Sequence, residues 1–370
     1  MLDINAYIDE NFTGNQIDKA IQEMRASNVP VFIWGGAELA KKIKWYLESR
    51  GIKISGFLIN RKFWNSNIHE WDGASVFVLE EYLPSHRCSL VVGFAGYCEN
   101  QLGSLSEYVC KVYALDFIGA LCLNGCCSTI SYEFYQKNRQ NWNWLNERVH
   151  DCKSRKAVRD FLFQRMTGMY QKEDSVPNAY FVKGIVVPQE DEVFVNCGAY
   201  HGEEAFRFVK YLHEYGIQRY QKIFCIEADP TNAGQMRTAL KSLENVEIIE
   251  AGVWDRAGTL CMSSGQDHSS RIMDEGETKI PVRTIDDILE GEKVTSPIFM
   301  KMDIEGSELK ALRGAEKTIR KYKPRLAICI YHKPEDLVEI PKYIDSLRKD
   351  YKFYIRNHSR YGVNTVLYAV

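Results

Sequence analysis

The chain has 370 residues and a mass of 42.7 kDa, and at roughly 100–200 residues per domain this length predicts two domains. Hydrophobic residues make up 45% and charged residues 26%, which excludes a collagen-like or wholly disordered chain. Lys and Arg total 47 against 49 Asp and Glu, a formal net charge of -2. The chain therefore has no overall positive charge to attract a phosphate backbone, which argues against nucleic acid as a partner.

The cysteines and the N-terminus indicate the compartment. The 11 cysteines are scattered and form no CxxC pair, which argues against a zinc framework. The start MLDINAYIDENFTGNQ lacks both the basic residues and the apolar core of a signal peptide. No later apolar run reaches the ~18 residues that a membrane span needs. We therefore expect a cytoplasmic protein with reduced thiols and no membrane span.

The first predicted domain is a small Rossmann-like parallel sheet over residues 1–120. Residues 29–60, VPVFIWGGAELAKKIKWYLESRGIKISGFLIN, run from an apolar strand through glycines into a helix and then a second strand. Further strands are expected at 75–78, at 89–94 and in KVYALDF, with a helix containing Gln101 and Tyr108 before the last of them.

Residues 121–180 are predicted to be a helical connector. The segment is aromatic and rich in Arg, with FYQKNRQNWNWLNERVHD and SRKAVRDFLFQRMTGMYQ as two candidate helices. Its aromatic side chains, Tyr135 and Trp142 among them, would be able to stack on sugar rings, but their helical spacing favours a packing face.

The second predicted domain, residues 181–370, returns to alternating strands and helices, so the fold class is α/β throughout. Its strands begin with EVFVNC and continue with KIFCIEAD, NVEIIEAGVWD, SPIFMKMDIEG, RLAICIYH, YKFYIRNH and NTVLYAV. The link between the last two is too short for a parallel crossover, which predicts an antiparallel final pair.

A glycine turn, NCGAYHG at residues 196–202, joins the first of these strands to a helix. Glycines permit close backbone approach, and a helix N-terminus offers unpaired N–H groups to a ligand, so the turn resembles a nucleotide cradle. The next strand ends in Glu227, where an acid can accept hydrogen bonds from ribose hydroxyls. The alternative is a solvated carboxylate at a strand end.

Acidic residues gather in MKMDIEGSELKALRGAE, where a buried strand emerges and a helix begins. In doubly wound folds the cleft lies at the carboxyl ends of the strands, which makes Asp303 the main active-site candidate. Glu308 is interpreted as a favourable charge near a helix N-terminus, and Glu305 is left open. His332 ends the following strand and should lie beside Asp303.

The segments VNCGAYHGEEAF, IEADP, EAGVWD, VRTIDDIL, MKMDIEGSELKALRGAE and KPRLAICIYH resemble, in this order, the FkbM-type methyltransferase family. The resemblance covers roughly residues 180–370. It implies a class I S-adenosylmethionine-dependent fold with a seven-stranded sheet and an antiparallel final hairpin. It also implies O-methylation, often of sugar hydroxyls on glycans or natural products.

The resemblance also implies a set of site residues. The methionine part of the cofactor would lie near Gly198 and Gly202, its ribose on Glu227, and the methyl-transfer face near Asp303. The adenine would lie near the loop after Gly252. The predicted cofactor contacts are Asn196, Gly198, Tyr200, Gly202, Glu227 and Asp255. The family usually has Asp where this chain has Asn196, so the lost charge would weaken cofactor binding.

Methyl transfer to a hydroxyl needs the oxygen held in line with the methyl group and a base that accepts the proton. His332 or Asp303 is the predicted base. Alternatively, these two residues with Glu305 would bind a divalent metal that lowers the pKa of the hydroxyl. Catalysis by a protein base without a metal is preferred, so no residue is predicted to be a metal ligand. His332 would otherwise be a packing residue.

The predicted function is S-adenosylmethionine-dependent O-methylation of a carbohydrate, glycan or glycoside. A catalytically silent binding module, motivated by Asn196, is the alternative. A nicotinamide-dependent oxidoreductase using the Gly35–Gly36 turn ranks last, because Asn60 stands where an acid would bind ribose. The N-terminal domain would recognise a nucleotide-sugar or glycan carrier, or serve only architecture or homo-oligomer formation.

Overall fold

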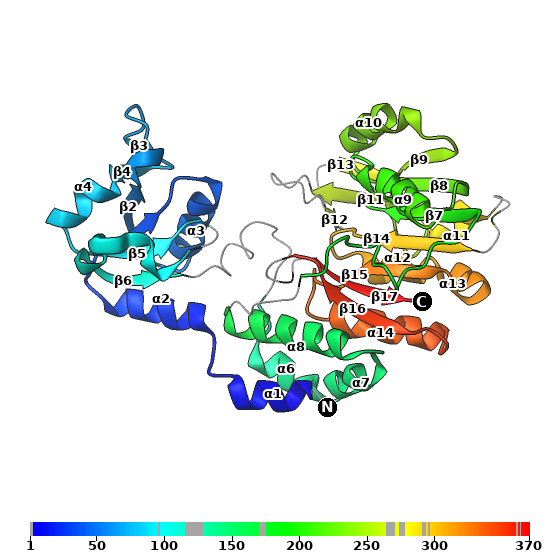
Figure 1. Cartoon of the computed structure of the whole chain (residues 1–370), viewed down its shortest axis with the longest axis horizontal. Coiled ribbons are helices and arrows are strands. Elements are labelled where there is room, and N and C mark those ends of the chain that lie inside the picture. The colour runs from blue at the N-terminus through cyan, green and yellow to red at the C-terminus, as the bar shows by residue number, and fades with distance from the viewer. Residues whose placement is uncertain are drawn as a thin grey trace. The chain divides into compact units, whose positions relative to one another are not determined.

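The chain folds into two compact units in a computed structural model (Figure 1), which describes residues 3–94, 97–114, 129–169, 175–263, 271–273, 278–290, 294, 297–359, 362 and 364–370. What we call the N-terminal unit comprises Ile8–Glu133 and Asp160–Lys172. The C-terminal unit comprises Met1–Tyr7, Phe134–Arg159 and Glu173–Val370. Each unit contains its own largely parallel sheet, which confirms the predicted α/β class.

The N-terminal unit is built on a six-stranded sheet of order β3-β4-β2-β1-β5-β6, parallel except for the pair β3–β4. Its strands are β1 (Val31–Trp34), β2 (Ile54–Ile59), β3 (Glu70–Trp71), β4 (Ala74–Val78), β5 (Cys88–Val92) and β6 (Val109–Tyr113), and its helices include α2 (Gln16–Ala26), α3 (Glu38–Glu48) and α4 (Leu79–Tyr82). All residues of β1 and β5 are buried, as expected for central parallel strands covered on both faces.

One predicted helix of this unit is replaced by a tighter structure. Residues Glu99–Tyr108 form the 3-10 segment η3, interrupted at Gly103, whose φ is 54°. A residue in the left-handed region breaks the repeat of an α-helix, so the apolar spacing of this segment does not continue as one.

The C-terminal unit contains a seven-stranded sheet of order β16-β17-β15-β14-β7-β8-β9. Its strands are β7 (Glu192–Cys197), β8 (Tyr220–Glu227), β9 (Val246–Glu250), β14 (Ile298–Met302), β15 (Arg325–Cys329), β16 (Phe353–Asn357) and β17 (Thr365–Ala369). Strand β17 is antiparallel to both β15 and β16. The seven strands and the antiparallel final pair are therefore as predicted.

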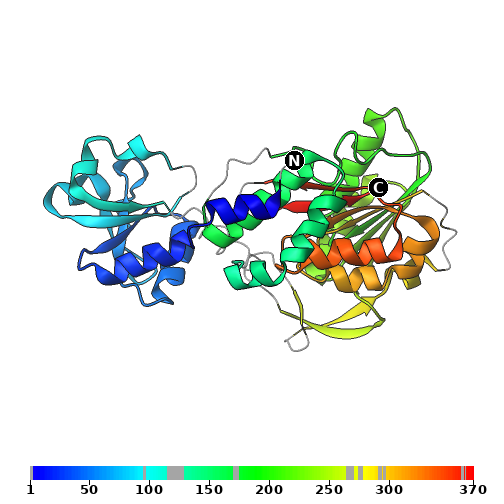
Figure 2. The same ribbon diagram turned by 90° about the horizontal axis from the view of Figure 1, so that it is seen from below.

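Helices flank this sheet and an aromatic stack packs against it. The helices are α9 (Glu203–Glu214), α10 (Pro230–Ala239), α11 (Ile285–Leu289), α12 (Glu308–Arg313), α13 (Glu316–Tyr322) and α14 (Asp336–Leu347). Helices α12 and α13 contact α14, and this group, coloured orange to red, lies on one side of the sheet (Figure 2). The rings of Phe194, Phe208 and Phe299 stack with centroids 4.6 and 5.3 Å apart, which fixes β7 against α9 and β14.

A second, four-stranded sheet of order β10-β13-β11-β12 belongs to the same unit. Its strands are β10 (Gly252–Val253), β11 (Gly258–Ser263), β12 (Arg271–Met273) and β13 (Thr278–Arg283). The sequence predicted a single strand through NVEIIEAGVWD, but β9 ends at Glu250 and the chain joins the small sheet at Gly252. The Ala251 N–H donates to the Glu227 carbonyl at 3.0 Å, which marks the point of exit.

The predicted connector forms α6 (Tyr132–Lys137), α7 (Arg139–Arg148) and α8 (Cys152–Thr167), and α1 (Ile4–Asn11) precedes them in the chain. Asn138 divides α6 from α7, because its side-chain amide donates to the Phe134 carbonyl at 2.9 Å and competes with the helix. Tyr135 and Trp142 are fully buried, which confirms the packing role. No helix among the described residues has the length and apolar character needed to cross a membrane.

Candidate active site

The glycine turn between β7 and α9 brings two strand ends together. Gly198 has a φ of +72°, and a Cβ atom on it would lie 1.9 Å from the Asp303 carbonyl oxygen. Gly202 has a φ of +88°, and its Cβ would meet Leu240 at 2.9 Å. The glycines were predicted to admit a ligand, yet at both positions the neighbour that excludes a side chain is the protein itself.

Four backbone N–H groups of the turn already have acceptors within the protein, although the sequence predicted open donors there. Those of Gly198 and Ala199 donate to the Ile226 carbonyl at 3.0 and 3.1 Å, and that of Gly202 to the Ala199 carbonyl at 2.7 Å. The Tyr200 N–H donates to Glu227 Oε2 at 2.8 Å. The turn thus holds the end of β8 in place.

Glu227 is oriented by this network. Its Oε1 accepts from the Asp229 N–H at 2.9 Å, while Oε2 accepts from Tyr200. A carboxylate has about four acceptor positions, so both oxygens retain capacity for a pair of ligand hydroxyls. A ribose diol matches this donor requirement, and the residues present therefore fit the nucleoside part of S-adenosylmethionine.

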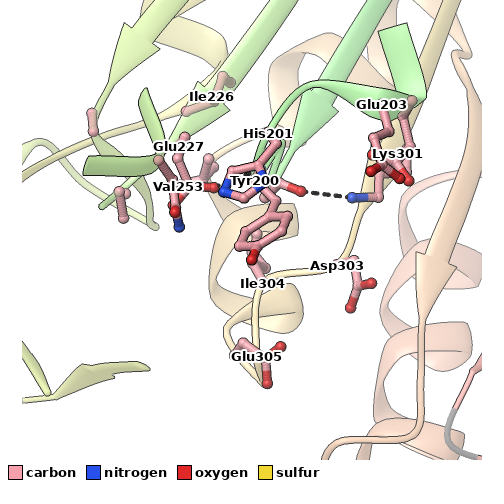
Figure 3. Close-up of a pocket in the computed structure, with 16 residues that line it drawn as sticks. Tyr200, His201, Glu203, Ile226, Glu227, Val253, Lys301, Asp303, Ile304 and Glu305 are labelled. Atoms are coloured by element: carbon pink, nitrogen blue, oxygen red, sulfur yellow. Dashed lines mark hydrogen bonds between the residues drawn. The ribbon is translucent and has the colours of Figure 1, made fainter. Parts of the chain in front are cut away.

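A cavity of about 320 Å³ opens at the carboxyl ends of β7, β8 and β14 (Figure 3). Its lining consists of Gly198, Tyr200, His201, Glu203, Glu204, Ile226, Glu227, Ala228, Asn232, Ala251, Gly252, Val253, Lys301, Asp303, Ile304 and Glu305. The structure thus brings together five predicted site residues, namely Gly198, Tyr200, Glu227, Asp303 and Glu305. The cavity size is in the range of small-molecule sites.

The other four predicted residues, Asn196, Gly202, Asp255 and His332, are outside the described lining. Asn196 is fully buried within β7, and neither its side-chain nitrogen nor its oxygen has a hydrogen-bond partner. Asp255 instead forms an ion pair with Lys310 at 3.0 Å. The predicted weakening of cofactor binding by Asn196 stays a prediction.

Asp303 is held by two tyrosines that the sequence did not single out. The Tyr180 hydroxyl donates to Asp303 Oδ2 at 2.8 Å, and the Tyr331 hydroxyl to Oδ1 at 3.3 Å. Burial raises the pKa of the Asp303 carboxyl, but the charges of Lys301 and His332 and the Tyr180 hydrogen bond outweigh it and lower that pKa. Asp303 is therefore an anion at neutral pH.

Tyr331 directly precedes His332, so its position at the end of a predicted strand is the feature that would have indicated it. Tyr180 lies 123 residues before Asp303 in the chain, within the range assigned to the connector. No local pattern indicates that pairing.

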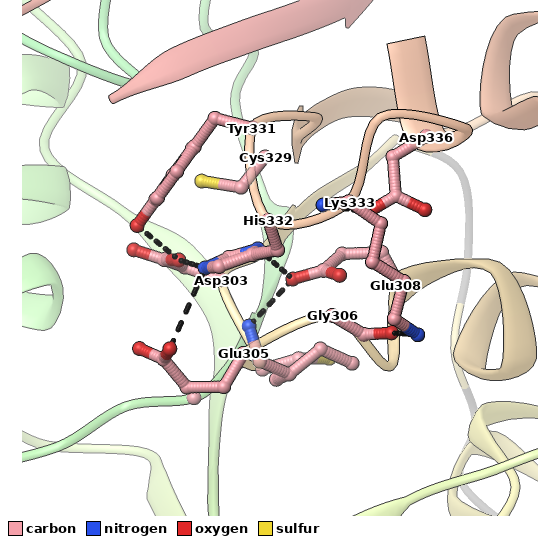
Figure 4. Close-up of polar contacts among 12 residues, drawn as sticks. Asp303, Glu305, Gly306, Glu308, Cys329, Tyr331, His332, Lys333 and Asp336 are labelled. Atoms are coloured by element: carbon pink, nitrogen blue, oxygen red, sulfur yellow. Dashed lines mark hydrogen bonds and ion pairs between the residues drawn. The ribbon is translucent and has the colours of Figure 1, made fainter. Parts of the chain in front are cut away.

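His332 lies beside the cavity among three carboxylates (Figure 4). Its Nε2 is 3.5 Å from Asp303 Oδ1 and 3.7 Å from Glu305 Oε2, and its Nδ1 is 3.1 Å from Glu308 Oε1. Burial lowers the pKa of the imidazole, but these negative charges outweigh it and raise that pKa to about 9. In the absence of a ligand these carboxylates thus favour the protonated imidazole; the base role of His332 stays a prediction.

The sheet order, the antiparallel final pair and a cavity bounded by Glu227 and Asp303 together define a Rossmann-type methyltransferase domain. Residues 196–353 match the family model described as Methyltransferase FkbM domain. These residues, somewhat less than half of the chain, thus carry an FkbM methyltransferase domain, as the sequence segments predicted.

Two individual proteins are similar to this chain. The crystal structure of methyltransferase FkbM from Methylobacillus flagellatus KT covers 95% of this chain and 93% of its own, with a TM-score of 0.72 and 21% identity, which shows a shared fold. The 2-O-methyltransferase NoeI of Sinorhizobium fredii is 22% identical over 157 residues, or 37% of this chain. That match spans 62% of the relative's length, less than two thirds.

Proposed function

We propose that the protein transfers the methyl group of S-adenosylmethionine to a hydroxyl of a carbohydrate, glycan or glycoside. The observation that carries this proposal is that Glu227 and Asp303 line one cavity on either side of the Gly198 turn. The FkbM domain supports methyl transfer, and the relative named 2-O-methyltransferase supports an oxygen acceptor. The carboxylates of Glu203, Glu204 and Glu305 suit a polyhydroxylated acceptor.

The residues divide into a cofactor side and an acceptor side. When bound, S-adenosylmethionine supplies an activated methyl group. Glu227 would hold the ribose hydroxyls, and the apolar side chains of Ile226 and Val253 would contact the adenine. Asp303, ionised and fixed by two tyrosines, would accept a hydrogen bond from the acceptor hydroxyl and orient its oxygen.

Cofactor binding tests the first side. In calorimetric titrations with S-adenosylmethionine and S-adenosylhomocysteine, Glu227→Ala should weaken binding at least about tenfold, because both ribose hydrogen bonds to a charged group are lost. Glu250 pairs with Glu227 in register on β9 and is absent from the cavity lining, so Glu250→Ala is the matched control. Equal affinities of the two variants would contradict the assignment.

Turnover tests the second side. Methyl incorporation from labelled S-adenosylmethionine would be measured over a panel of sugars, glycosides and glycolipid precursors. Asp303→Asn should lower turnover by about 10²-fold or more while S-adenosylhomocysteine still binds. Cofactor binding without transfer to any acceptor would instead favour the catalytically silent module.

A further inference from the structure

Three side chains of the acceptor side converge on one point. One ligand-type atom each of Asp303, Glu305 and His332 lies within 4.8 Å of the others. Asp303 and Glu305 line the cavity, and the imidazole of His332 closes the group from the protein side (Figure 4). The cluster combines two carboxylates with one imidazole from two consecutive strand ends of the sheet.

The histidine is positioned as a ligand would be. Only 1% of its side chain is exposed. Its Nδ1 faces Glu308 Oε1 at 3.1 Å, whereas its Nε2 makes no hydrogen bond. Its Nε2 is aimed between the carboxylates of Asp303 and Glu305 at 3.5 and 3.7 Å. A buried nitrogen without a hydrogen bond is costly unless something else binds it.

Groups behind the cluster fix the orientation of its members. Glu308 is fully buried, with Oε1 3.1 Å from His332 Nδ1 and accepting from the Ile304 N–H at 2.9 Å. A carboxylate on the far nitrogen of a histidine is the usual support for a metal-binding imidazole. The hydroxyls of Tyr180 and Tyr331 fix Asp303 in the same way.

We propose that Asp303, Glu305 and His332 bind one divalent cation of the Mn²⁺ type at the wall of the cavity. Carboxylates suit Mg²⁺ and Mn²⁺, while an imidazole ligand favours the transition ion. Metal–ligand distances of about 2.1 Å place neighbouring ligands roughly 3.0–3.4 Å apart. The two distances from the imidazole, 3.5 and 3.7 Å, need only a small contraction. The group as a whole, whose atoms lie within 4.8 Å of one another, must draw closer around the ion.

The cation has a role that rests on the proposed function. Three protein ligands leave about three positions of an octahedral ion open, enough for two neighbouring hydroxyls of a sugar. The cation lowers the pKa of the bound hydroxyl, whose proton leaves to solvent. The oxygen electron pair then forms the new O–CH₃ bond as the C–S bond breaks and its pair stays on sulfur. No imidazole base is required.

Manganese binding tests the site without cofactor or acceptor. Chelator-treated full-length protein would be titrated with Mn²⁺, and the free ion measured by electron paramagnetic resonance. We expect one saturable site, weakened at least about tenfold in Glu305→Gln. Glu335→Gln, which changes an exposed acid just after His332, is the matched control and should bind as the unmodified chain does.

Two outcomes overturn the proposal: no saturable Mn²⁺ binding by the unmodified protein, or equal binding by the Glu305→Gln and Glu335→Gln variants. Thermal unfolding of each metal-free variant checks that it is folded. Titration of the same samples with S-adenosylhomocysteine separates the two proposals, because it tests cofactor binding in the absence of metal.

Discussion

Gly198 is a residue at which one added carbon would separate two strand ends. Its φ of +72° and the 1.9 Å approach to the Asp303 carbonyl both exclude a side chain. Gly198→Ala should lower the free energy of unfolding by roughly 2–5 kcal/mol, from backbone strain and steric overlap together. Urea unfolding of the cofactor-free protein measures this difference.

Gly216, at the other end of α9, supplies the comparison. Its φ is +77°, but a Cβ there would meet nothing within 4 Å. Gly216→Ala should therefore cost only about 1 kcal/mol. If the two variants lost equal stability, the close approach at Gly198 would contribute nothing.

At the scale of single residues, the sequence was sufficient to identify the acidic residues that follow the strands. Glu227 and Asp303 follow buried strands directly, and the carboxyl ends of parallel strands share one edge of a sheet. It did not locate Tyr180, because the contact with Asp303 depends on tertiary packing. Nor did it show that the carboxylates around His332 would raise the pKa of the imidazole, since Glu308 had been placed by helix position alone.

Among the elements, α8 is joined to β16 by a charged contact. Asp151, just before α8, accepts from the Ser154 N–H at 2.8 Å and from Arg356 at 3.1 Å. Partial burial raises the pKa of the Asp151 carboxyl, but the hydrogen bonds from Arg356 and Ser154 and the charge of Arg356 outweigh it and lower that pKa to about 2. The folded state therefore favours the ionised form.

Because the pKa of Asp151 is lower in the folded state than in the unfolded state, ionised Asp151 stabilises the fold at pH values above its unfolded pKa of about 3.8. This stabilisation is lost as the pH falls toward 2. Asp151→Asn should cost about 1 kcal/mol at pH 7, allowing for solvent screening, and progressively less below pH ~5. Asp191, 3.8 Å from Arg219 with both side chains exposed, provides the control variant Asp191→Asn. A pH-independent difference between unmodified protein and Asp151→Asn would refute the linkage.

Strand prediction succeeded where apolar runs were long and bounded by turns, as in EVFVNC and RLAICIYH. It missed the four-stranded sheet, because its strand β10 is only two residues long and continues directly from the β9 pattern. Where the chain leaves β9, the Ala251 N–H donates to the Glu227 carbonyl of β8 at 3.0 Å, a contact that the local sequence does not indicate.

Across the whole molecule, two glycine turns follow first strands of parallel sheets, but their surroundings differ. In the N-terminal unit a Cβ on Gly36 would overlap the Ile59 side chain at 2.4 Å. Asn60, where a dinucleotide site would place an acid, accepts from Trp34 Nε1 at 2.9 Å and donates to Glu80 at 3.0 Å. These contacts favour a purely structural role for this turn over nicotinamide binding.

Hydrogen exchange would test this difference in one experiment. Saturating S-adenosylhomocysteine should slow exchange in residues 197–203, 226–229 and 303–306, because bound ligand suppresses local opening. Exchange in residues 34–37 should not change. Protection of that second turn, by this ligand or by a nicotinamide cofactor, would show that the N-terminal unit also binds nucleotides.

The division of the chain has a consequence for synthesis. Residues 1–7 and 134–159 belong to the same unit as the C-terminal strands, while 160–172 return to the N-terminal unit. A nascent chain exposes its N-terminal segments first. The unit that contains residues 1–7 can therefore be completed only after its last strand has been synthesised. Truncation after residue 120 would therefore divide both units, and truncation after residue 180 would divide the C-terminal unit.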